Sequence, residues 1–158
     1  MLSGNPDKFA VWYDAVDAWS TPKFANGCFG FFIGEEFVWS RRSTLGVDMH
    51  MLSQLHCMNH SVEDVALFER PVNAAYSELC SRTFPDVDSD ATGNDFTHLV
   101  SAESLSDDGH YFFLVECGQR AKLIYGFKDE PNSVREILLG LGEFQSVVRD
   151  AIARSKAA

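Results

Sequence analysis

The sequence predicts a single α+β domain over residues 1–158, with an antiparallel sheet of about six to seven strands, a helical insertion and a packed C-terminal helix. Segments with the two-residue alternation of strands flank a middle region with helical spacing. The connections between strand-like segments are short, as antiparallel neighbours allow. A chain of 158 residues with 46% hydrophobic residues can fill one core.

The first part of the chain predicts a strand followed by a hairpin. Residues 9–15, FAVWYDA, alternate in a way typical of a strand that is partly covered on both faces. Residues 20–27 have turn chemistry, and residues 28–39 form two aromatic-rich arms around Gly34-Glu35. Glycine at the first turn position favours a type II′ turn.

The middle region predicts three helices. Residues 44–56 place apolar side chains and His56 on one inward helical face. Residues 61–70 open with a capping-box spacing in which Asp64 replaces the usual glutamate or glutamine. Residues 72–83 form an amphipathic pattern that a phenylalanine–proline pair ends.

The last part predicts a meander and a closing helix. The strand candidates are residues 97–105, 110–117 and 121–127, with 133–139 as a further strand. Residues 143–156 carry one apolar helical stripe, with basic residues towards the C-terminal end where the helix dipole favours them.

An acidic run, DVDSDATGND, spans Asp86 to Asp95. A calcium loop needs oxygen ligands at positions 1, 3 and 5, glycine at 6 and a bidentate glutamate at 12. A loop that starts at Asp88 has suitable residues at positions 1, 3, 5 and 6. Position 12 is then Leu99, whose side chain has no ligand atom. The pattern favours a solvated acidic loop, with a calcium-binding module as the alternative.

A second candidate for metal binding is the cluster of His50, His56 and His60 with Cys57. A structural zinc site usually shows two paired spacings, and here one pair, His56-x-x-x-His60, fits. We therefore expect core or helix-end histidines, and keep a zinc module as the alternative.

The sequence lacks the glycine-rich, nucleophile-elbow and zinc-protease motifs of common enzymes. The carboxylate pairs Glu35-Glu36 and Asp107-Asp108 fall in predicted hairpin turns, where we expect solvated surface charges rather than catalytic groups. We expect no catalytic residue and no cofactor. The alternative is a small enzyme that uses the acidic run or the histidine cluster.

The formal net charge of −10 disfavours nucleic acid as a partner and favours a basic protein. Residues 1–14 lack the basic and apolar regions of a signal peptide, and no apolar stretch is long enough to span a membrane. We expect a cytoplasmic protein whose four cysteines are small apolar residues rather than disulfides.

Three short motifs carry a resemblance to a known family. GNPDKFA at residues 4–10 is similar to an opening G-D-P-x-x-F-A, with Asn5 in place of the aspartate and Asp7 where an aromatic is frequent. NGCFGFFIGEEF at 26–37 is similar to an N-G-x-F hairpin, and STLGVDMHML at 43–52 to T-T-L-x-x-D-x-x-x-L. On these motifs the chain resembles the bacterial immunity protein 42 family.

The resemblance implies a cytoplasmic protein that binds and neutralises a cognate toxin encoded beside it. Such toxins often attack nucleic acid with a basic cleft, which an acidic surface would complement. Trp12, Trp19 and Trp39 are candidate interface anchors, although core positions suit them equally. The candidate residues for the acidic contact surface are Asp86, Asp88, Asp90, Asp95, Glu35, Glu36, Asp107 and Asp108.

Overall fold

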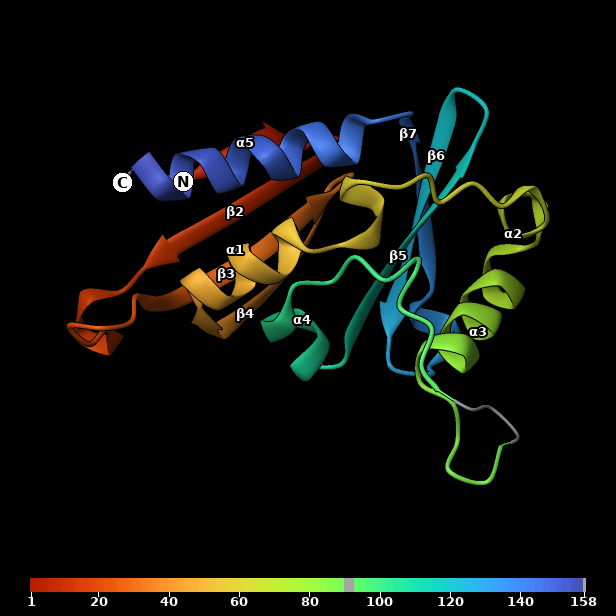
Figure 1. Ribbon diagram of the computed structural model, residues 1–158, viewed down its shortest axis with the longest axis horizontal. Helices are drawn as coiled ribbons and strands as arrows, with labels where there is room; N and C mark the ends of the chain where they lie inside the picture. The colour runs from red at the N-terminus through yellow and green to blue at the C-terminus, as the bar shows by residue number, and fades with distance from the viewer. Residues whose placement is uncertain (90–92, 158) are drawn as a thin grey trace.

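The computed structural model describes residues 1–89 and 93–157 and confirms the α+β architecture (Figure 1). Its strands form two antiparallel sheets rather than one, with the orders β1-β2-β3-β4 and β5-β6-β7. The strands are β1 (Leu2–Asn5), β2 (Phe9–Ala15), β3 (Asn26–Ile33), β4 (Glu36–Thr44), β5 (His110–Cys117), β6 (Arg120–Phe127) and β7 (Arg135–Gly140).

The helices cover selected faces of the two sheets. Helix α5 lies along the first sheet, whereas α2 and α3 flank the second (Figure 1). The chain ends lie side by side (Figure 1), and Arg154 Nη1 donates to the Leu2 carbonyl at 3.1 Å. The helices are α1 (Leu45–Ser53), α2 (Val65–Glu69), α3 (Val72–Thr83), α4 (Glu103–Asp107) and α5 (Glu143–Ala157), with 3₁₀ turns η1 (Asp17–Trp19), η2 (His56–Met58) and η3 (Pro131–Ser133).

The predicted strand and hairpin of the first sheet are confirmed. Gly34 has φ of 61°, while Glu35 keeps a negative φ, as a type II′ turn requires. The sequence reasoning missed β1, which is too short to show alternation. It pairs antiparallel with β2, placing Leu2 opposite Trp12.

The predicted strand at residues 97–105 is wrong. Leu99 makes a single bridge to Phe113, and the chain then turns into the short helix α4. Ala102 and Leu105 are both fully buried. Their spacing of three puts them on one side of a helical turn, whereas a strand would send them to opposite faces.

Helix α1 is shorter than predicted. Leu45, Met49 and Leu52 are buried on its inner side as expected, but the helix ends at Ser53. His56 therefore lies beyond the helix and is exposed, so its predicted inward position is wrong.

Helix α2 begins later than the capping-box pattern predicts. It starts at Val65, and Asp64 itself is the cap, because its Oδ1 accepts the Leu67 N–H at 3.0 Å. The residues before it lie against β5, where Asp64 donates its backbone N–H to the Glu116 carbonyl at 3.0 Å.

The main apolar core lies between the two sheets and beneath α1 and α5. Phe31 is fully buried at its centre. Its ring lies 5.2 Å from Phe9 and 5.6 Å from Phe29 within the first sheet. It also lies 5.0 Å from Phe112 of β5 and 6.4 Å from Phe144 of α5. These contacts connect both sheets and the last helix through one side chain.

A second apolar cluster fills the other side of the second sheet. Helix α3, which the sequence predicts correctly, buries Tyr76 and Leu79 against Phe113 and Ile124. The second sheet is thus covered on both faces, which explains the nearly continuous apolar sequence of β5 and β6.

Candidate functional site

The acidic run follows α3 on the surface. Asp86, Asp88 and Asp95 are exposed, and Asp90 lies outside the described residues. Asp95 Oδ1 accepts the Thr97 N–H at 3.0 Å. Hydrogen bonds from the Thr97 side chain and backbone lower the pKa of Asp95. Asp95 therefore fixes the end of the run, while Asp86 and Asp88 present carboxylates at its start.

A cleft of about 700 Å³ opens beside the start of this run, between α3 and the β6–β7 connection. Its lining includes the aromatic side chains Tyr76, Phe84 and Tyr111 together with Asp86 and Asp129. The sequence reasoning missed Asp129; its signal was an acidic residue in the turn between two predicted strands. Asp86 thus belongs to a concave surface with aromatic walls and two carboxylates.

The pair Glu35-Glu36 lies at the β3–β4 turn, as predicted. Glu36 Oε2 accepts the Tyr125 hydroxyl hydrogen bond at 3.0 Å. Burial, with this hydrogen bond, raises the pKa of Tyr125 well above its ordinary value. Glu36 therefore connects the two sheets, and both Glu35 and Glu36 are exposed.

Asp107 and Asp108 do not form the predicted hairpin turn, because they end helix α4. Arg42 Nε donates a hydrogen bond to Asp108 Oδ1 at 3.1 Å, and the same guanidinium forms an ion pair with this carboxylate. Burial acts to raise the pKa of Asp108, but hydrogen bonds from Ser40 and Arg42 outweigh it and lower the pKa. Asp108 therefore holds α4 to β4, and Asp107 is exposed.

The described acidic candidates do not form one site. Asp108 and Glu36 lie near the same imidazole, that of His110. Burial lowers the pKa of His110, and the two carboxylates oppose that effect. The start of the acidic run, residues 86–89, lies at another part of the surface, beyond the end of α3 (Figure 1). The described candidates therefore lie in two places, around His110 and along the acidic run.

The histidine cluster does not supply a metal site in the described part of the chain. His50, His56 and His60 are exposed, and the His56 and His60 rings stack at 4.4 Å. Within residues 1–89 and 93–157, no group of three or more His, Cys, Asp or Glu side chains is placed to hold a metal ion. The structure gives the calcium and zinc alternatives no support.

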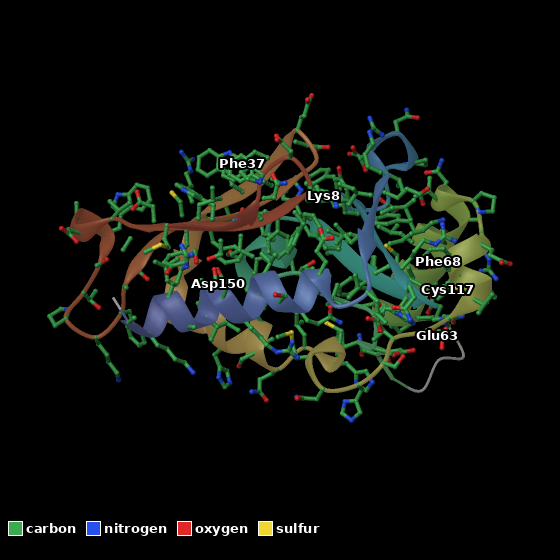
Figure 2. The ribbon with its side chains drawn as sticks, turned by 90° about the horizontal axis from the view of Figure 1, so that it is seen from above. Lys8, Phe37, Glu63, Phe68, Cys117 and Asp150 are labelled. Atoms are coloured by element: carbon green, nitrogen blue, oxygen red, sulfur yellow. The ribbon has the colours of Figure 1, made fainter. Side chains whose placement is uncertain are left out.

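Four aromatic side chains gather on the outer side of the first sheet, and we call this surface the aromatic face: Trp12, Phe32, Phe37 and Trp39. Phe37 is at its centre. Its ring stacks on Phe32 at 4.2 Å, meets Trp12 edge-on at 5.5 Å and lies parallel to Trp39 at 6.2 Å. Figure 2 shows Phe37 on the side of the sheet away from α5.

The structure places two of the three tryptophans that the sequence offered as interface anchors, Trp12 and Trp39, on this surface. Trp12 is half-buried there and Trp39 is 48% exposed. Trp19 is also 48% exposed, but it lies in η1, outside the aromatic face. The sequence does contain a signal for this surface. Residues 9–15 and 28–39 alternate, and with the strands in register this alternation puts Trp12, Phe32, Phe37 and Trp39 on one side of the sheet.

Comparisons with known proteins give a consistent result. The profile described as immunity protein 42 matches residues 1–154. The chain is similar to the crystal structure of CdiI from Burkholderia dolosa AUO158, with a TM-score of 0.94 and 62% sequence identity. That match covers 98% of this chain and 99% of the other. The comparison with curated proteins gives no match. Since the family profile spans nearly the whole sequence, this chain belongs to the immunity protein 42 family.

Proposed function

We propose that this chain neutralises its cognate toxin by stoichiometric binding and performs no chemistry of its own. The toxin-neutralising immunity function follows from the family, and the match over residues 1–154 is the observation that carries the proposal. The 62% identity with CdiI supports it further. The candidate carboxylates in the described part of the chain are exposed or occupied in structural hydrogen bonds, which suits binding better than acid–base catalysis.

The partner in this proposal is a basic toxin domain in the cytoplasm. The net charge of −10 would attract such a domain and speed its encounter with the chain. The exposed candidates for this attraction are Asp86, Asp88, Asp95, Glu35, Glu36 and Asp107, with Asp90 as a further sequence-based candidate. The acidic run concentrates several of these carboxylates within ten residues, and we expect such a local concentration of charge to steer a basic partner more strongly than single carboxylates elsewhere on the surface.

No helix in residues 1–89 and 93–157 combines the length and the apolar character needed to cross a membrane.

The double variant Asp86→Asn/Asp88→Asn tests the steering role of the acidic run. With the toxin domain encoded beside this chain's gene, we expect association to slow by about 3- to 10-fold at low ionic strength. Dissociation should change little, because both side chains are exposed. Stopped-flow fluorescence at low and physiological ionic strength measures both rates, and the difference should shrink as salt screens the charges.

A matched control is Asp17→Asn/Glu69→Gln, which removes the same charge from two exposed acids outside the candidate set. We expect this control to slow association by less than about twofold. Equal slowing in both variants would show that net charge alone matters and would remove the acidic run as a special surface. A wild-type chain that neither binds nor inhibits this toxin domain would reject the proposed function itself.

A further inference from the structure

The two sides of the first sheet differ sharply in how they are covered. Its inner side carries Phe9, Phe29 and Phe31, which are buried at 1%, 0% and 0% exposure beneath α1 and α5. The four rings of the aromatic face belong to neither apolar core cluster of the described residues. Trp39 keeps 48% of its surface in contact with solvent. A partly exposed group of aromatic rings of this kind commonly marks an interaction surface.

The rings of the aromatic face are held in place before any partner arrives. In the sheet, Gly30 of β3 lies between Trp12 of β2 and Trp39 of β4. A Cβ atom on Gly30 would lie 2.7 Å from Phe37 Cε2 and 2.8 Å from Trp39 Cβ. The missing side chain therefore lets the two rings lie close over the strand. Rigid, stacked rings lose little conformational entropy on binding, which favours tight association.

The charges around this face bear on the choice of partner. Asp14 and Cys28 form the next cross-strand pair on this side of the sheet beyond Trp12 and Gly30, and Glu35 lies at the turn beside Phe32 and Phe37. Arg41 follows on β4. The surroundings of the face thus include two exposed carboxylates and one exposed guanidinium. A second copy of the chain would bring two bodies of charge −10 together, which is repulsive, whereas a basic partner is attracted.

We propose that the aromatic face is the surface on which the cognate toxin domain docks, with Trp39 and Phe37 as its anchors. This inference rests on the proposed function and adds the location of the contact. Acidic residues elsewhere then speed the encounter, while the rings hold the complex together. Interfaces commonly concentrate their binding energy in a few central aromatic side chains, and surrounding charges mainly affect the association rate.

The variant Trp39→Ala tests this surface, and Trp19→Ala is a matched control because both indole side chains are 48% exposed. Using the toxin domain encoded beside this chain's gene, we expect Trp39→Ala to raise Kd by about 30-fold, mainly through faster dissociation. Trp19→Ala should stay within about twofold of the wild type. Isothermal titration calorimetry gives Kd, and circular dichroism verifies that each variant is folded.

A second experiment uses the wild-type chain, so that its result does not depend on whether the Trp39→Ala variant folds. Hydroxyl-radical footprinting with mass spectrometry reports the oxidation of Trp39 and Trp19 with and without the toxin domain. Protection of Trp39 alone supports the proposal. Equal oxidation of Trp39 in the free and bound states overturns the docking surface while binding itself still stands. Absence of binding by the wild type overturns the proposed function instead.

Sedimentation velocity of the chain alone tests the remaining occupant, a second copy. A monomer at micromolar concentration supports the proposal. A dimer that dissociates in the Trp39→Ala variant overturns it, because the aromatic face would then be a contact between copies of this chain.

Discussion

Replacing Phe31 with alanine is expected to lower the free energy of unfolding by about 4 kcal/mol. The Phe31 ring is fully buried and touches rings from β2, β5 and α5. Those neighbours are held by their own strands and helix, so they cannot move in to fill the space left by the ring. The lost contacts therefore combine with the cost of a cavity.

Urea titration monitored by circular dichroism measures this loss of unfolding free energy. In a separate thermal melt, the midpoint temperature should fall by about 10 °C. Phe24→Ala is the control, because the Phe24 side chain is 48% exposed. We expect that control to lose less than about 0.5 kcal/mol, as for most surface substitutions. A loss below about 1.5 kcal/mol for Phe31→Ala would contradict the central packing role described for this ring.

The second large effect is expected for Asp48→Ala, with a loss of about 3 to 4 kcal/mol. Asp48 is 1% exposed in the first turns of α1. Its carboxylate accepts the Ser104 N–H at 2.9 Å, the Ser104 hydroxyl at 2.6 Å and the hydroxyl of Ser43. Alanine would leave these donors buried without an acceptor, and each such donor costs about 1 to 3 kcal/mol.

Asp107→Ala provides the matched control, since it removes an exposed aspartate at the other end of α4. We expect a change within about 0.5 kcal/mol for it. Denaturant titration of both variants decides the question. If Asp48→Ala unfolds at the same urea concentration as Asp107→Ala, the carboxylate does not hold α1, β4 and α4 together.

Asp48 also shows what a short motif can and cannot reveal. It is the aspartate of the segment STLGVDMHML, which resembles a family motif. The motif indicates that this position matters, but the reason lies in Ser104, which is 56 residues away along the chain. A local pattern contains no information about such a partner, so a structural role and a binding role look the same in sequence.

The elements that could be predicted are those whose pattern is local and complete. The strand at residues 9–15, the hairpin turn at Gly34 and the helix at 72–83 each show their full periodicity within their own length. The failures depend on distant packing. Residues 97–105 pass beside β5 and turn helical against Asp48, and the division into two sheets depends on helices and strands far along the chain.

The same limit applies to the candidate site. The alternation of β2 and β4 assigns Trp12 and Trp39 to one side of their strands. Which side stays open depends on where α1 and α5 pack, and α5 lies at the opposite end of the sequence. The sequence shows which residues are acidic, but the role of each depends on its hydrogen-bond partner. Partners such as Arg42 and Tyr125 come from strands that are distant in the sequence.

The packing of α5 on β1 and β2 has a consequence for synthesis in the cell. Phe144 of α5 stacks on Phe9 at 4.9 Å, so the first strands meet their cover only after residues 143–157 have been made. Until the ribosome releases that segment, the part of the first sheet that α5 covers stays exposed in the nascent chain. Contacts between such distant segments also slow folding. Newly made molecules would therefore become protective with a delay after translation ends, and a chaperone that shields the unfinished sheet would raise their yield.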